Sequence, residues 1–364
     1  MAKKAVIIVG AGASYDCANG LGIANLDWRP PLARQLFERV QRVQGLLGGY
    51  PGAQLIQSTQ PQLQAPEVDL ERELRRASEH QQLSRAFVDV PPYLRALITR
   101  CGRDYLPNGR TETYAQLVLG LVNSGHEVAF VSLNYDSLLE QAISQVLGRH
   151  FNRLSDYWVQ NPLVIKPHGS VDWFWLHARG AEESADQFRD RLASANRGET
   201  TFQRRLAMCE PWAEVFPLAG WMREEANGTR TVLRGQDSTA QTVWLYPAIT
   251  APVSNKDRKD LVPPEEHFEK LRAFQVDCAK YLFLGTSGLD DHILRLIGNG
   301  CGGERPLLCN VSQGSDSEVG AVTERLAGGL TAGAQRELNF ERWQWGGGFN
   351  AWVQAVNFSD FLEA

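Results

Sequence analysis

The chain has 364 residues, of which 43% are hydrophobic and 22% charged, a composition typical of a globular protein. Its formal charge of −5 at pH 7 disfavours a surface that coats nucleic acid, and no apolar stretch approaches the roughly 20 residues needed to span a bilayer. The apolar run that follows two lysines near the start reaches glycine too early for a signal peptide. We therefore expect a cytoplasmic protein with no membrane contact and no direct binding of nucleic acid.

The chain up to residue 112 opens with a strand and then reads as mostly helical. Residues 4–9 form a short, β-branched apolar run, the pattern of a strand buried on both faces. Pro30 and Pro31 stand where a helix with apolar positions through residue 43 would begin. Residues 48–66 are rich in Gly, Pro and Gln and predict a loop, residues 69–87 predict a charged helix, and Pro91-Pro92 starts another.

From residue 113 onward the pattern alternates between helices and strands. Helices are predicted at 114–122, 136–147, 264–279 and 315–326 and from residue 290 or 291, and strands at 127–132, 162–166, 242–249, 281–284 and 306–311. An aromatic segment, 172–176, continues the strand at 162–166. Such alternation predicts an α/β fold, a Rossmann-like and mostly parallel sheet with helices on both faces.

We predict one catalytic domain over residues 1–328, with helical insertions at about 48–112 and 178–240. Residues 329–364 form a Trp-rich extension that packs on the core or makes an interface, and they are too few for a further sensor domain. The six cysteines form no C-x-x-C pair, so neither a zinc ribbon nor a disulfide framework is predicted, and reduced, buried thiols are expected.

Several polar or glycine-rich turns directly follow predicted buried strands, which would bring them to one edge of the sheet, where open α/β sheets bind ligands. The first is Gly10-Ala11-Gly12-Ala13-Ser14. Small residues let a backbone approach a pyrophosphate closely, and its N–H groups can donate to the phosphate oxygens. The third glycine of G-x-G-x-x-G is replaced by Tyr15, so a tight turn without a ligand is a close alternative.

The second and third turns supply candidate catalytic groups. Asn134, after the strand at 127–132, can fix a ribose hydroxyl or a water by donating and accepting together. Asp136 either touches the ligand or caps the following helix. His168, after the strand at 162–166 and beside Gly169, suits a base near neutral pH; the alternative is a histidine that only hydrogen-bonds a loop.

The fourth turn is Gly285-Thr286-Ser287, and Asn310 ends the next strand. Hydroxyl and amide groups at strand ends suit ribose and phosphate recognition. Asp290 and Asp291 read first as residues that start a helix.

Together these segments resemble the sirtuin family, and more closely its bacterial sirtuin-like branch. The matches are the GAG-x-S loop at residues 10–14, the asparagine and aspartate of T-Q-N-I-D at Asn134 and Asp136, H-G at His168-Gly169, G-T-S at residues 285–287, and an asparagine at Asn310. They follow the family's order over roughly residues 5–326, with the two insertions left out.

The resemblance implies an NAD site. His168 would then be the catalytic base or the polariser of a ribose hydroxyl, and Asn134 would position that ribose or the attacking water. Asp136 would order the nicotinamide end, the residue 10–14 loop would hold the pyrophosphate, and the Gly285-Thr286-Ser287 turn with Asn310 would hold the adenosine side.

Two features of deacetylating sirtuins are missing, the zinc ribbon and the G-I-P-D-F-R segment, which is only echoed by Gly22-Ile23-Ala24-Asn25. Both serve the acyl-lysine peptide. The branch that shares these departures is associated with NAD depletion in bacterial antiphage defence, so the leading interpretation is an NAD glycohydrolase without zinc. Its activity would be gated by homo-oligomerisation or by a separate sensor such as a HerA-type ATPase or a short Argonaute.

Two other functions stay open at this point. A protein deacylase or an ADP-ribosyltransferase would use the same NAD site with another nucleophile, and a non-catalytic sensor would bind NAD or ADP-ribose without turnover. An ordinary dehydrogenase is disfavoured, because the third glycine and the acidic residue that binds ribose are both absent.

Overall fold

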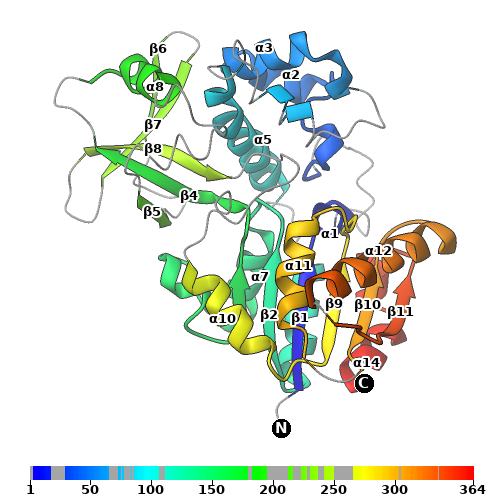
Figure 1. The fold of residues 1–364 in the computed structure, drawn as a ribbon. Helices are drawn as coiled ribbons and strands as arrows, with labels where there is room; N and C mark the ends of the chain where they lie inside the picture. Colours follow the sequence, from blue (N-terminus) through cyan, green and yellow to red (C-terminus); the bar gives the residue numbers. More distant parts are fainter. Residues whose placement is uncertain are drawn as a thin grey trace. The chain divides into compact units, whose positions relative to one another are not determined.

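The computed structural model describes most of the chain, which forms two compact units (Figure 1). The first unit comprises Met1–Pro30, Gly102–Pro167 and Pro263–Ala364, and the second Pro31–Cys101 and His168–Val262. The described residues are 3–17, 29–64, 73–74, 76–77, 83, 86–105, 111–178, 183–194, 212–215, 223–227, 230–236, 242–249, 265–302, 305–334 and 336–364.

A six-stranded sheet forms the centre of the first unit, and every pairing in it is parallel. Its order is β11-β10-β9-β1-β2-β3. The strands are β1 (Lys3–Val9), β2 (His126–Ser132), β3 (Leu163–Ile165), β9 (Lys280–Leu284), β10 (Leu307–Val311) and β11 (Glu341–Trp345). This sheet confirms the predicted Rossmann-like α/β class and five of its strands; β11, from the Trp-rich extension, was not predicted.

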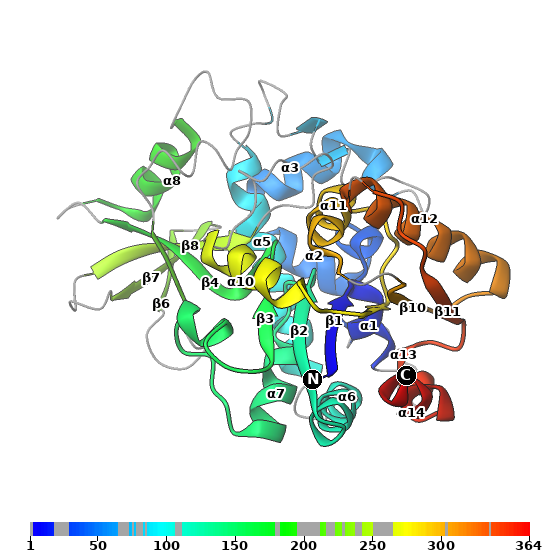
Figure 2. The same ribbon diagram turned by 60° about the horizontal axis from the view of Figure 1, so that its bottom comes forward.

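Helices cover both faces of this sheet (Figures 1 and 2). One face carries α10 (Glu265–Gln275), α11 (Asp291–Gly300) and α12 (Asp316–Ala334). The other carries α1 (Ala11–Asp16), α6 (Glu112–Asn123), α7 (Leu138–Leu147), α13 (Phe349–Val353) and α14 (Val356–Glu363). Residues Leu154–Tyr157 form a 3₁₀ turn, η7. Because the strands are covered on both sides, β9 and β10 are buried along their whole length, which explains their mainly apolar sequence.

The strand order places a topological switch point between β1 and β9. From β1 the chain continues to β2 and β3 on one side, and it returns to β9, β10 and β11 on the other. The connections after β1 and β9 therefore leave the sheet in opposite directions, the arrangement in which open α/β sheets form a ligand crevice at the carboxyl ends of the strands.

The C-terminal residues close the first unit rather than trail from it. Trp352 of α13 is buried and packs against the rings of Phe358 and Phe361 in α14. Lys3 donates to the Leu362 and Glu363 carbonyls, and Lys280 donates to the Phe361 carbonyl at 2.9 Å. These lysines satisfy carbonyls at the end of a helix, which have no partner within it.

The second unit is built around an antiparallel sheet with the order β5-β4-β8-β7-β6. Its strands are β4 (Gly169–Ala178), β5 (Trp212–Val215), β6 (Arg223–Asn227), β7 (Arg230–Gln236) and β8 (Thr242–Ile249). Its helical elements are η3 (Ala33–Gln35), α2 (Gln41–Leu47), α3 (Pro51–Thr59), η4 (Pro61–Gln64), η5 (Ala86–Asp89), α5 (Val90–Tyr105, up to Cys101) and α8 (Ala185–Ser194).

Three expectations from the sequence are wrong in this unit. Residues 172–176 and 242–249 are strands, but they pair antiparallel in β4 and β8 rather than join the parallel sheet. The described part of the predicted loop, residues 48–64, is mostly helical, because Pro51 begins α3 at the first helical position, where a missing N–H costs nothing. No helix starts at Pro30 or Pro31; the chain makes η3 and then α2.

The predicted charged helix at 69–87 lies largely outside the described residues, as do 195–211 of the second predicted insertion. The extents of the catalytic domain (1–328), its insertions and the extension (329–364) remain proposals.

Candidate functional site

The candidate site lies at the carboxyl edge of the parallel sheet, where β1, β2 and β9 end. The turns after these strands contain Gly10–Ser14, Leu133–Ser137 and Gly285–Ser287. Hydrogen bonds connect the first turn to each of the other two. The structure thus brings together three of the segments that the sequence singled out.

The turns after β1 and β9 pack backbone against backbone. Gly10 N–H donates to the Leu284 carbonyl at 2.8 Å, and Gly12 N–H donates to the Gly285 carbonyl at 3.0 Å. A Cβ on Gly10 or Gly12 would lie 2.6 or 2.8 Å from the Gly285 carbonyl oxygen, closer than real Cβ contacts allow. Gly285 has φ +58°, the left-handed region that favours glycine. Glycine is therefore required here by packing inside the protein.

The same geometry defines which N–H groups of the loop are engaged. Gly10 and Gly12 donate across to the β9 side, and Ala13 N–H donates to the Gly10 carbonyl at 3.0 Å. The loop does not remain extended after β1, because Ala11–Asp16 forms the short helix α1 with Gly10 as its N-cap. In this structure, then, three of the N–H groups considered for a pyrophosphate already donate within the protein.

Asn134 is held in one orientation beside this loop. Its side chain is 5% exposed, and its Nδ2 donates to the Gly10 carbonyl at 3.0 Å and to Ser14 Oγ at 2.9 Å. Its Oδ1 is buried and has no hydrogen-bond partner within the part of the chain that the structure describes. Since both Nδ2 hydrogens are used, Asn134 can offer a ligand only an acceptor, not the donor and acceptor expected from the sequence.

Ser14 joins Asn134 to two further buried groups. Its Oγ lies 2.9 Å from the Tyr114 hydroxyl, and its O–H donates to the Asp136 carboxylate. Because Ser14 has one proton and gives it to Asp136, the Tyr114 hydroxyl must be a donor to Ser14. Tyr114 was not identified from the sequence, which shows only an apolar position of a helix.

Asp136 serves the start of α7 and the site together. Its Oδ1 accepts the Leu138 N–H at 3.1 Å, although the N-cap position itself belongs to Ser137. Burial raises the pKa of the Asp136 carboxyl, while Lys166, the Leu138 N–H and the Ser14 hydroxyl act in the opposite direction. The sequence left capping and ligand contact as alternatives, and the structure shows a capping contact.

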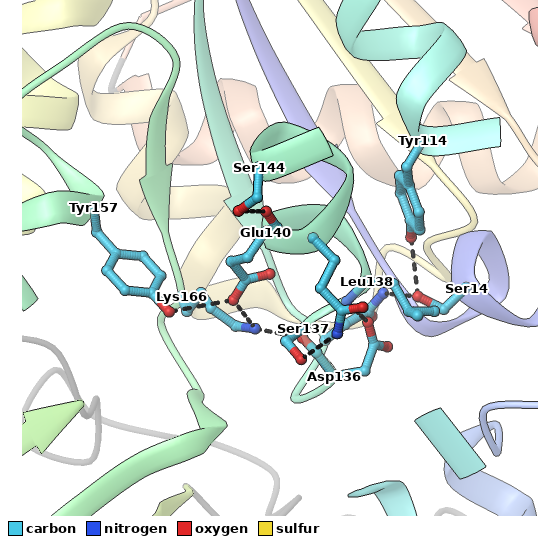
Figure 3. Close-up of polar contacts among 11 residues, drawn as sticks. Ser14, Tyr114, Asp136, Ser137, Leu138, Glu140, Ser144, Tyr157 and Lys166 are labelled. Atoms are coloured by element: carbon cyan, nitrogen blue, oxygen red, sulfur yellow. Dashed lines mark hydrogen bonds and ion pairs between the residues drawn. The ribbon is translucent and has the colours of Figure 1, made fainter. Parts of the chain in front are cut away.

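A buried ion pair lies beneath the Asp136 turn (Figure 3). The Lys166 ammonium is 0% exposed, lies 2.7 Å from Glu140 Oε1 and donates to the Asp136 carbonyl oxygen. The Tyr157 hydroxyl donates to Glu140 Oε1 at 3.4 Å. Neither charged residue was assigned a role from the sequence, although a lysine at the end of a predicted buried strand was a visible signal.

His168 is the first residue of the second unit, immediately before β4. Its side chain is buried, and the following Gly169 has φ +79°. The approach of His168 to Asn134 stays a prediction.

The residues proposed for the adenosine side differ in how they are engaged. Thr286 Oγ1 is buried and unpartnered among the described residues, whereas Ser287 is exposed and its carbonyl accepts from Arg325 at 2.6 Å. Asn310 is fully buried, and its Nδ2 donates to the Val319 carbonyl and to Thr323 Oγ1, which ties β10 to α12. Asn310 therefore links β10 to α12 through its Nδ2, while its Oδ1 is buried without a partner among the described residues, as is that of Asn134.

The remaining expectations concern the start of α11, the Gly22–Asn25 segment, metal sites and membrane helices. Asp290 caps α11 by accepting the Ile293 N–H, as predicted. Gly22-Ile23-Ala24-Asn25 lies outside the described residues. Within the ranges described, no group of three or more His, Cys, Asp or Glu is arranged to hold a metal ion, and none of the helices is long and apolar enough to cross a membrane.

No known protein-family model matches the chain, and no curated protein matches its sequence. Among solved structures, it is similar to a Sir2–p53 peptide–NAD⁺ complex, with 12% identity, a TM-score of 0.36 and coverage of 99% of this chain and 94% of that one. It is also similar to Sir2Tm bound to a propionylated peptide, with 10% identity, a TM-score of 0.34 and the same coverage. These values are too low to transfer the roles of individual residues.

Proposed function

We propose that the chain is an NAD glycohydrolase, which cleaves the nicotinamide–ribose bond with water and releases nicotinamide and ADP-ribose. The single observation that carries this proposal is the state of Asn134: a buried amide oxygen, fixed in direction and unpartnered among the described residues, at the switch point of a parallel sheet. A buried polar atom left without a partner is costly, so its natural complement is a donor brought by a ligand or a water.

Hydrolysis needs two functions from the chain: a group that orients the water or the ribose, and a base that accepts a proton. Asn134 Oδ1 would accept a hydrogen bond from the attacking water or from a hydroxyl of the nicotinamide ribose. The water oxygen bonds to the ribose C1′, the C1′–N bond breaks, and its electron pair remains on the nicotinamide nitrogen. His168 would take the proton that the water loses. The packed turns after β1 and β9 would lie along the pyrophosphate of NAD at the switch point.

The biological setting that we propose is a gated effector that depletes NAD in bacterial antiphage defence. Support comes from the order of the short motifs and from the two missing peptide-handling features. An enzyme that destroys its host's NAD must be held inactive, so we propose control by homo-oligomerisation or by a separate sensor protein.

Two alternatives use the same site. A deacylase or ADP-ribosyltransferase would replace water by another nucleophile, and a sensor would bind NAD without turnover. The unpartnered Asn134 oxygen favours water chemistry over pure binding, because an acceptor fixed in one direction is suited to orienting a water or a ribose hydroxyl.

The test is to incubate the purified chain with NAD, with and without an acylated peptide, and to separate the products by chromatography. ADP-ribose formed without peptide supports hydrolysis, whereas O-acyl-ADP-ribose formed only with peptide favours deacylation. Tight NAD binding without turnover, with candidate partner proteins also present, would indicate a sensor.

Two variants assign the residues. His168→Ala should abolish turnover while NAD binding is largely kept, and His150→Ala, a change at an exposed histidine, is the matched control. Asn134→Ala, measured on folded variant protein, should lower kcat at least tenfold below that of the wild type, since it removes the oriented acceptor. Full activity in either site variant would remove that residue from the mechanism.

A further inference from the structure

We infer that Lys166, paired with Glu140, is a positioning residue that locks the turn carrying Asn134 and Asp136. The consequence for catalysis rests on the proposed NAD hydrolysis, while the consequence for the turn does not. Lys166 acts through the backbone and side chain of the turn after β2.

The contacts connect Lys166 to Asn134 through two routes. Its ammonium donates to the Asp136 carbonyl, two residues along the chain from Asn134. Its charge also favours the ionised Asp136 carboxylate, which accepts from Ser14, whose Oγ in turn accepts from Asn134 Nδ2. Figure 3 shows the ammonium reaching both Glu140 and the turn, with Ser14 and Tyr114 beyond it. Removing the cation therefore loosens the turn at its carbonyl and at its carboxylate.

The burial of the pair argues against a purely stabilising role. Lys166 is 0% and the Glu140 side chain 5% exposed, and Glu140 Oε2 has no hydrogen-bond partner in the described structure. Desolvating two charges with one oxygen left unsatisfied offsets much of their attraction, and apolar side chains of similar volume are often at least as stable in such places. The feature that apolar side chains cannot reproduce is the directed bond to the Asp136 carbonyl, which fixes the turn.

The experiment uses a double variant in which neither charge is left buried alone. Lys166→Met with Glu140→Leu removes both charges and keeps the volume, so the thermal midpoint should stay near that of the wild type. The control, Arg272→Met with Glu265→Leu, removes an exposed ion pair of α10 that does not touch the turn.

Hydrogen–deuterium exchange is the first readout and needs no enzymatic activity. The double variant should exchange the amides of residues 133–138 at least tenfold faster than the wild type, while α6 stays unchanged. The control variant should exchange like the wild type in both segments. Unchanged exchange at 133–138 in the folded double variant would overturn the inference.

Kinetics with NAD are the second readout. The double variant should lose at least tenfold in kcat with less than threefold change in KM, because a loosened turn misorients Asn134 without removing a substrate contact. An equal loss of kcat in the control would also overturn the inference. If the wild type does not turn over NAD, the proposed function fails, and exchange still decides whether Lys166 locks the turn.

Should the double variant fail to fold, two single variants give the same decision. Glu140→Gln keeps the ammonium–carbonyl bond and should keep exchange at 133–138 slow. Lys166→Gln loses that bond and should make exchange fast. Equal exchange rates in the two variants would contradict the inference.

Discussion

Replacing Gly285 by alanine tests whether the two glycine turns are one packed unit. Two separate costs act at this position. Its φ of +58° is left-handed, which costs an L-residue about 1 kcal/mol. The added Cβ would also lie 2.1 Å from the Ala13 backbone nitrogen and 2.4 Å from the Gly12 carbonyl carbon. These are backbone atoms, so no side chain can rotate away, and forced overpacking adds about 1–3 kcal/mol or more.

We therefore expect Gly285→Ala to lower the free energy of unfolding by about 2–4 kcal/mol or more. For a domain of this size each kcal/mol lowers Tm by roughly 2–4 °C. The matched control is Gly125→Ala, whose φ is +74° but whose Cβ would meet nothing within 4 Å. The control isolates the backbone cost, about 1 kcal/mol.

Denaturant unfolding and thermal melting of the two variants provide the measurement. The difference between them is the contact of the β1 and β9 turns. Gly285→Ala should in addition reduce NAD turnover, because the β1 turn holds Asn134 through the Gly10 carbonyl. If Gly285→Ala is no less stable than Gly125→Ala, the close backbone packing at the switch point is refuted.

Three further outcomes follow from buried groups. Burial raises the pKa of the Asp136 carboxyl, so the folded state binds its proton more tightly than the unfolded chain, and the ionised carboxylate lowers stability at neutral pH. The Tm of Asp136→Asn minus that of the wild type should therefore be larger at pH 7 than at pH 4. A Tm difference that is larger at pH 4 would contradict this. Burial lowers the pKa of His177 from 6.5 to about 4, so the stability that neutral His177 contributes above pH 6.5, up to about 3 kcal/mol, is lost as the pH falls toward 4. In urea unfolding, the free energy of unfolding of His177→Phe should fall less over that pH range than that of the wild type. Equal falls would exclude His177 as the cause. A Cβ on Gly120 would lie 2.6 Å from the Phe358 ring, so Gly120→Ala should speed hydrogen exchange in α14. The control is Gly45→Ala, whose Cβ would meet nothing within 4 Å. Equal exchange of the α14 amides in the two variants would show that α14 does not pack on α6.

Much of the first unit could be predicted from local sequence. Five of its strands are runs of mainly apolar residues, as expected for a sheet covered on both faces, and Asp290 marks the start of α11 by its side-chain chemistry. The second unit was harder. The strands β4 and β8 have the same apolar character as parallel strands, and whether they pair parallel or antiparallel depends on partners far away in the sequence.

For the candidate site, the sequence by itself indicated that the turns after β1, β2 and β9 meet, because parallel strands bring their carboxyl ends to one edge. It also supplied the amide of Asn134 and the glycines that the β1 turn requires. Only the tertiary structure decided which hydrogen-bonding groups are available to a ligand. Both hydrogens of Asn134 Nδ2 are donated to Gly10 and Ser14, and only its amide oxygen has no partner among the described residues. It also decided that Lys166 and Glu140 meet beneath the turn. The physical reason is that hydrogen-bond capacity is shared among neighbours in space, and those neighbours come from strands and helices far apart along the chain.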